Sequence, residues 1–274
     1  MLDALAAFLK LLVYAGALAG AGGAVAAASL RLTSGPMAQA ARKLVGTGAG
    51  VLAIAAAGGF AVFLLRLGGV DADTVQIALE TGPGRAAGLH LAGAAGLIAG
   101  VALRRPMVSA LAAAPVFAGF AISGHGVAAA PWAGVAAGLH VAATAWWTGS
   151  LVLLRAGREG LSPAAFTDLV RRFGRQALVI VGGLVALGLA LGLRLLDGNL
   201  AVERPYVRFL LVKLAFAASA LAIALHNRLV LTPRLDRDAT ALPRLVRAAG
   251  LELGLIAAVA GATALMTTYA SPTE

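Results

Sequence analysis

The sequence predicts an all-α, polytopic integral membrane protein that forms one bundle of eight transmembrane helices. Hydrophobic residues make up 60% of the 274 positions and charged residues only 12%, whereas about a quarter of a soluble domain is charged. The mean hydropathy is +0.90. Apolar runs of about 20 residues, the length that crosses a bilayer, recur along the whole chain. We therefore treat residues 1–274 as a single membrane domain.

Eight apolar stretches can be placed in order, at 9–30, 44–65, 84–103, 106–124, 132–154, 174–196, 206–229 and 245–268. The first has no basic region before it, so we expect a retained span and not a signal peptide. Lys10, at its start, is expected to snorkel outward. Glycine pairs at four-residue spacing predict close helix approach at Gly16/Gly20, Gly96/Gly100 and Gly188/Gly192.

Two connections carry features of their own. Ser162-Pro163 is a typical helix start, with a capping side chain followed by proline. The helix it opens is either a short interfacial helix that binds anionic lipid or an extension of the sixth span. Residues 66–83 carry Asp71, Asp73 and Glu80 at a spacing unlike a calcium loop. We expect a solvated loop there.

Basic residues are distributed unevenly between the two sets of connections. The links 31–43, 104–105, 155–175 and 228–247 hold 15 Lys and Arg residues, and the alternate links hold 5. Because cytoplasmic loops retain Lys and Arg, the first set is predicted to face the cytoplasm. Both termini then face outward. The net charge of +10 is explained by this bias, so we expect membrane lipid and not nucleic acid as the partner.

The residue inventory limits the chemistry. Cysteine is absent, which excludes disulfides and thiolate metal sites. The sequence contains no Gly-rich phosphate loop, nucleophile elbow or H-E-x-x-H motif. Nothing indicates hydrolysis or group transfer, and we predict that the chain is not an enzyme unless it binds a redox cofactor.

The histidines are the strongest candidate site residues, because ionisable groups at membrane depth are rare and functional by default. The segment around His90 (86–92) is similar to the segment around His140 (136–142), and each histidine is predicted to lie on the order of 10 Å below the outer surface. His125 lies at the outer end of the fourth span. His226 lies near the inner end of the seventh, where an interfacial role is expected. Thr144 and Trp147 share a helix face with His140.

Two functions and one structural role remain open for these residues. A metal site of His90, His125, His140 and Met266 would suit copper, especially Cu(I). Alternatively, His90 and His140 would hold haem b between helices, with Lys213 binding a propionate. The third possibility is a lipid-embedded scaffold in which each histidine donates to a carbonyl. Glu252 is expected to pair with His226, Asn227 or Arg228, and the alternative is that it begins an exit path for a cation.

Several segments resemble the copper resistance protein D (CopD) family. They are Ser123-Gly124-His125, the segment 139–151 with His140 and Trp146-Trp147, the segments 172–177 and 206–213, Asn227-Arg228 followed by Pro233, and Arg247 with Glu252 before a Thr-rich helix end. Their order along the chain makes the resemblance specific. It covers most of the sequence and is best from about 120 to the carboxy-terminus.

The resemblance implies an eight-helix protein of the bacterial inner membrane that handles periplasmic copper. Copper ions would enter toward the cytoplasm, and a periplasmic copper-binding protein would be a partner. His125 and His140 occupy positions that match the family segments. His90 and His226 depart from the pattern, and the low methionine count, 4, argues against a methionine-lined channel.

Overall fold

The computed structural model describes residues 1–123, 130–196, 201–238 and 240–270, and the regular elements in these ranges are helical. In chain order they are α1 (Leu2–Ser29), α2 (Gly35–Leu67), α3 (Ala72–Glu80), α4 (Gly82–Ala102), α5 (Pro106–Ile122), α7 (Pro131–Gly160), α8 (Pro163–Leu196), α9 (Pro205–His226), a π turn (Asn227–Leu231), a 3-10 turn (Thr232–Arg234) and α10 (Ala241–Tyr269). The all-helical prediction is confirmed for these residues.

Seven of the described helices are long and apolar enough to cross a membrane: α1, α2, α4, α7, α8, the helix beginning at Pro205 (α9 with its following turns) and α10. The expected fourth span corresponds to α5, which is apolar but has only 17 residues. The chain is therefore a multi-pass membrane protein. Most helices begin earlier than their apolar runs, because polar and charged residues continue them beyond the hydrophobic segment.

The two connections with local features have different outcomes. Residues 66–83 are not only a loop, because they contain α3. The Asp71 carboxylate caps this helix by accepting the backbone N–H of Thr74 at 2.9 Å and the Thr74 hydroxyl at 2.8 Å. After Ser162, one uninterrupted helix runs from Pro163 to Leu196. The extension of the sixth span is therefore confirmed, and a separate interfacial helix is excluded.

Glycines let the first helices approach closely. A Cβ at Gly48 would lie 2.2 Å from the nitrogen of Gly20, and one at Gly16 would lie 2.5 Å from the nitrogen of Leu52. Gly96 and Gly100 meet Ala112 and Ser109 of α5 in the same way. The prediction is wrong for the α8 pair, because Gly188 faces the His140 ring and Gly192 has nothing within 4 Å.

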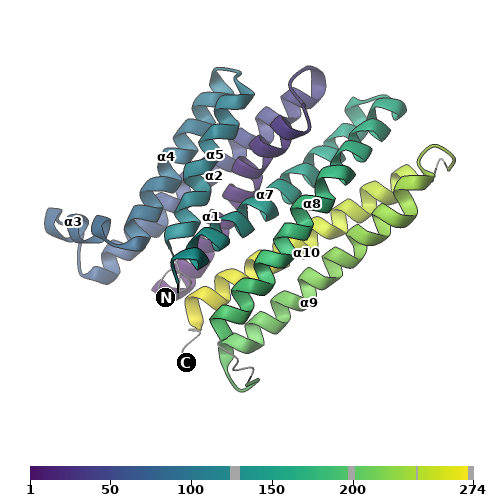
Figure 1. Ribbon diagram of the computed structural model, residues 1–274. Coiled ribbons are helices and arrows are strands. Elements are labelled where there is room, and N and C mark those ends of the chain that lie inside the picture. Colours follow the sequence, from purple (N-terminus) through teal and green to yellow (C-terminus); the bar gives the residue numbers. More distant parts are fainter. Residues whose placement is uncertain (124–129, 197–200, 239, 271–274) are drawn as a thin grey trace.

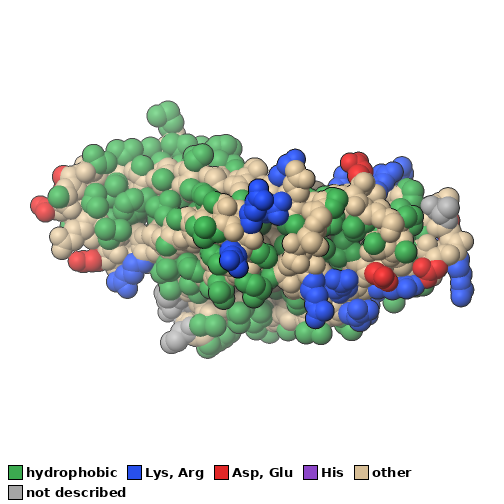
Figure 2. Space-filling view, turned by 90° about the horizontal axis from the view of Figure 1, so that it is seen from above, with side chains coloured by type: hydrophobic (Ala, Val, Ile, Leu, Met, Phe, Trp, Pro, Cys, Tyr) green, Lys and Arg blue, Asp and Glu red, His purple; other side chains and the backbone are tan. Residues whose placement is uncertain are grey.

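The antiparallel arrangement gathers the basic connections at one end of the bundle. Figure 1 shows the links α1–α2, α4–α5, α7–α8 and α9–α10 at its upper end, whereas the two termini lie close together at the opposite end. On the face seen from above, Lys and Arg side chains form several groups between hydrophobic side chains, mostly over the right half of the view (Figure 2). We call the end with the basic connections the arginine-rich end. Trp146 lies toward it, where its indole stacks on Phe173 and donates to the Ser29 hydroxyl at 2.8 Å.

Candidate functional site

A cavity of about 580 Å³ lies between the helices, at the end of the bundle that carries the two termini. This volume is within the usual range of ligand sites. Its walls come from α1, α2, α4, α5, α7, α8, α9 and α10, and four predicted site residues lie on them: His90, His140, Lys213 and Met266. The cavity therefore unites residues that are more than 170 positions apart in the chain.

His140 on α7 is held by one ring nitrogen. Its Nδ1 lies 3.2 Å from the carbonyl oxygen of Leu184 on α8, so the Nδ1–H form donates to this carbonyl and leaves the Nε2 lone pair free. Metal-bound histidines commonly donate their other ring N–H to a carbonyl or carboxylate in this way. Gly188, one turn further along α8, leaves room for the ring, because a Cβ there would lie 3.1 Å from Cε1. The imidazole is thus oriented by α8 before any ligand binds.

The neighbours of His140 on its own helix play structural roles. Thr144 lines the cavity, but its hydroxyl donates to the backbone carbonyl of His140 at 2.9 Å and not to the ring. Trp147 is buried and belongs to the main hydrophobic cluster. Trp147 therefore packs in the core, and Thr144 fixes the helix around the histidine.

His90 on α4 has an unusual environment. Its side chain is buried, and Nε2 has no hydrogen-bond partner. The ring lies against Phe120 of α5, with 4.7 Å between the centroids. A Cβ at Gly119 would lie 2.5 Å from Nε2, so glycine at that position makes space for the imidazole. A buried nitrogen without a partner is costly, and this observation makes His90 a candidate ligand residue.

Positive charge dominates the cavity. Lys10, Arg66 and Lys213 line it, and none of the described lining residues is Asp or Glu. The Lys10 ammonium donates to the carbonyl of Thr267 at 3.0 Å, and Arg66 pairs with Asp3 at 2.6 Å. Lys213 is close enough to His140 to interact with it electrostatically. The expectation that Lys10 snorkels outward is wrong, because α1 begins eight residues before it and Lys10 faces the interior.

Met266 contributes a thioether to the same cavity. Its side chain is buried against Tyr206 and Ala270, and Tyr206 also lines the cavity, together with Lys213. Sequence reasoning missed three lining residues: Lys10, Tyr14 and Arg66. The spacing of Lys10 and Tyr14, i and i+4 on an otherwise apolar helix, was the available signal for a polar face.

The predicted metal site is assembled only in part. His90, His140 and Met266 share the cavity, but within the residues that the structure describes no group of three or more His, Cys, Asp or Glu side chains could hold a metal ion. His125 lies outside the described residues. His226 is exposed and lies at the arginine-rich end of α9, apart from the cavity. The role of each residue as a ligand stays a prediction.

A second polar cluster lies deeper in the bundle. Glu252 of α10 and Asn227 of the π turn are both buried, and the Asn227 amide donates to Glu252 Oε1 at 2.6 Å. The expected pairing of Glu252 with one of the residues 226–228 is thus confirmed, and Asn227 is the partner. The Trp147 side chain lies near the Glu252 carboxyl. We call Glu252, Asn227 and Trp147 the inner polar cluster.

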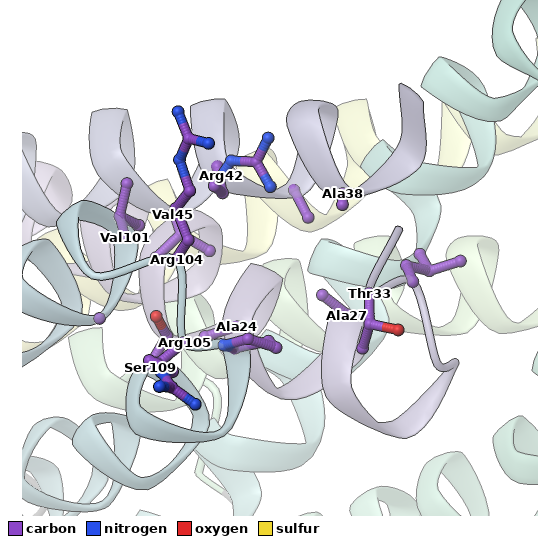
Figure 3. Close-up of a pocket in the computed structure, with 14 residues that line it drawn as sticks. Ala24, Ala27, Thr33, Ala38, Arg42, Val45, Val101, Arg104, Arg105 and Ser109 are labelled. Carbon is purple, nitrogen blue, oxygen red and sulfur yellow. The ribbon is translucent and has the colours of Figure 1, made fainter. Parts of the chain in front are cut away.

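A smaller hollow of about 40 Å³ lies at the arginine-rich end, between the α1–α2 and α4–α5 connections. It is large enough for a few water molecules. Arg42, Arg104, Arg105 and Ser109 line it (Figure 3), and the side chains of Arg42 and Arg104 extend to the same side. None of the predicted ligand residues lies there, so the 580 Å³ cavity is the candidate functional site.

Comparison with known proteins identifies the carboxy-terminal part of the chain. Residues 167–266 match the family model of copper resistance protein D. This region is similar to copper resistance protein D, and the match covers less than half of the chain. It comprises most of α8 and α10 and all of α9, and therefore Lys213, Met266, Asn227 and Glu252. The CopD match does not extend to His90, His140 or the resembling segment 139–151. No curated protein and no solved structure matches the chain.

Proposed function

We propose that this chain is a copper-handling protein of the bacterial inner membrane that moves copper from the periplasmic side toward the cytoplasm. The observation that carries the proposal is that His90, His140 and Met266 line one cavity in a chain whose residues 167–266 match copper resistance protein D. Imidazole and thioether ligands favour copper, and the thioether favours Cu(I). His125 is proposed as a further imidazole ligand.

The proposed topology has eight spans, with the 17-residue α5 as the fourth. A helix of about 17 residues is at the lower limit for crossing a bilayer. The arginine-rich end supports a cytoplasmic location for that end, and the closeness of the two termini supports their location on one side, the periplasmic side. The cavity then opens toward the periplasm, where a periplasmic copper-binding protein would deliver the ion.

The charges around the cavity favour transient binding over storage. Lys213, close to His140, makes the site less favourable for a bare cation than two imidazoles and a thioether would be alone. A transport site must bind its ion well enough to capture it and weakly enough to release it. Neutral ligands beside a fixed positive charge meet both conditions.

Copper binding to the purified protein tests the proposal. We expect about one Cu(I) ion per chain in a titration against a chromogenic competitor, and at least a tenfold loss of affinity in His140→Ala and in Met266→Ala. His226→Ala is the matched control, because this histidine is exposed and outside the cavity. Wild-type protein that binds no copper, or His140→Ala protein that binds it with unchanged affinity, would contradict the proposal.

Haem b binding is a second candidate, and one observation favours it. Three cationic side chains and no carboxylate line the described walls of the cavity that holds His90 and His140, as two propionates and bis-histidine ligation would require. Haem would have to draw the His90 ring away from Gly119. An absorption spectrum of the purified protein decides between the candidates: a Soret band lost in His140→Ala supports haem, whereas colourless protein that binds copper excludes it.

A further inference from the structure

The inner polar cluster lies directly beside the cavity. Ile256 lines the cavity and is one helical turn from Glu252 on α10, and Thr144 lines it and is about one turn from Trp147 on α7. One turn corresponds to about 6 Å along a helix. Trp147 and Glu252 interact with each other. The cluster therefore lies on the side of the cavity that leads toward the arginine-rich end.

Glu252 lacks a cationic partner. Its side chain is only 2% exposed, and neither of the ion pairs found among the described residues includes it. Two basic residues of neighbouring elements are bound elsewhere: Arg155 donates to the carbonyl of Val246, and Arg228 donates to the carbonyl of Gly174. The Asn227 amide donates a hydrogen bond to the carboxyl, as it would to an ionised group. A buried carboxyl group in this situation is either neutral or bound to a cation.

Asn227 provides an independent observation that points to a ligand. Its side chain is 9% exposed, and its Oδ1 is buried without a hydrogen-bond partner. The nitrogen of the same amide donates to Glu252, so the unpaired oxygen belongs to the amide group that contacts the carboxyl. The two residues thus offer carboxylate and amide oxygens at one place. Oxygen ligands alone suit hard cations and not copper.

The backbone around Asn227 also favours the binding of a cation. Asn227 begins a π turn of 5 residues that replaces the regular end of α9, and π turns are frequently found at functional sites. The carboxy-terminal end of a helix carries partial negative charge, which stabilises cations. Interrupted helices and helix ends provide the coupling-ion sites of many secondary transporters.

We propose that Glu252 and Asn227 form a second site, which binds a sodium ion through oxygen ligands. Its role as the coupling ion for copper movement rests on the function proposed above, whereas sodium binding does not. The division of labour follows from the donor atoms: imidazole and thioether face the cavity, and oxygens form the inner site. Occupation of the inner site would place a positive charge one turn from the cavity and favour release of the copper ion.

Sodium binding to purified, copper-free protein tests the site itself. We expect saturable binding of radioactive sodium at about one ion per chain at pH 8, a loss of more than tenfold in Glu252→Gln, and a clear weakening in Asn227→Ala. Glu159→Gln is the control, because Glu159 is an exposed carboxylate at the same end of the bundle. No saturable sodium binding to the wild type, or equal binding to Glu252→Gln, overturns the proposal.

A second measurement uses only the wild type, so its result does not depend on whether the variants fold. Sodium is expected to raise the melting temperature of the wild type relative to an equal concentration of choline, because a ligand that binds only the folded state stabilises it. An identical melting temperature in the two salts overturns the site. A shift that follows pH alone, in either salt, also overturns it, because a proton would then occupy Glu252.

Copper uptake into proteoliposomes tests the coupling. We expect the initial rate to change at least several-fold with the direction of a sodium gradient in the wild type, and to be independent of it in Glu252→Gln. Uptake without any sodium dependence overturns the coupling role. Absence of copper uptake in every condition contradicts the proposed function, and sodium binding measured without copper stays as a separate result.

Discussion

The two halves of the bundle differ in how closely their helices pack. In the amino-terminal half, α1 meets α2 and α7 at glycines: a Cβ at Gly22 would lie 2.1 Å from the carbonyl oxygen of Ala145, and one at Gly149 would lie 2.4 Å from the carbonyl carbon of Gly22. In the carboxy-terminal half, α8 and α9 have only 6% of their most apolar window buried, compared with 50% for α7. The first half is a rigid frame, and α8 and α9 lie mostly against lipid.

The cavity lies where these two halves meet. His90 and His140 belong to the closely packed half, whereas Lys213 belongs to α9, within the region that matches copper resistance protein D. The Nδ1 of His140 is bound by a carbonyl of α8, so a loosely packed helix orients a ligand of the rigid half. We infer that the rigid half fixes the positions of the histidines and the other half adjusts their environment.

The largest effect is expected from a substitution that disrupts the packing of the rigid half. Gly149→Ala places a methyl group against the backbone of α1, where no side chain can move away, and overpacking of this kind costs about 1–3 kcal/mol or more. We expect a melting temperature lower by roughly 5–10 °C and less folded protein in the membrane. Gly192→Ala on α8 is the matched control, because nothing lies within 4 Å of the new methyl group. Equal destabilisation of both variants would show that the two halves pack alike.

The rigid half is also the part that the sequence predicts best. Helix existence follows from the length of the apolar runs, and the contacts of Gly16, Gly20, Gly96 and Gly100 follow from small residues at four-residue spacing. The same rule fails for Gly192, because spacing does not say whether a helix face meets protein or lipid. The prediction for Lys10 is wrong for a related reason. Hydropathy gives the depth of a residue in the membrane, but the direction of its side chain depends on where the helix begins and on the neighbouring helices.

Some lining residues of the candidate site were predictable from the sequence, but its geometry was not. Charge bias and span positions place His90 and His140 at similar depth, and both line one cavity. Which ring nitrogen is free depends on carbonyls of other helices, such as that of Leu184, and sequence spacing carries no information about these contacts. The pairing of Asn227 with Glu252 was within reach, because the seventh and eighth spans are consecutive and antiparallel.

The next prediction concerns the loosely packed half and has a smaller expected effect on stability. Lys213→Met removes a positive charge near His140 with little change in volume. We expect the affinity for Cu(I) to rise by up to about tenfold while the melting temperature changes little. The control for a general change in net charge is Lys43→Met, because Lys43 lies near the start of α2, toward the arginine-rich end and away from the cavity. An unchanged affinity in Lys213→Met would mean that α9 does not adjust the cavity.

The smallest expected effect concerns α3, which belongs to the amino-terminal half in sequence but lies outside its packing (Figure 1). Hydrogen bonds from the backbone N–H and the hydroxyl of Thr74 lower the pKa of the Asp71 carboxyl below its usual value. A lowered pKa means that the cap stabilises α3 above the usual carboxyl pKa of 3.8 and is lost as the pH falls through the lower value. At neutral pH the cap is therefore fully present.

Hydrogen exchange of the α3 amides measures this effect. We expect faster exchange at neutral pH in Asp71→Ala, because a helix without a capping side chain frays at its first turn. In the wild type the same increase should occur only below about pH 4. Asp71→Asn, whose amide oxygen also caps, should keep exchange slow and remove the pH dependence. Amides of α1 and α7 should not respond in any variant. Their acceleration would mean that α3 stabilises the packed frame, which would extend the rigid half beyond the membrane-spanning helices.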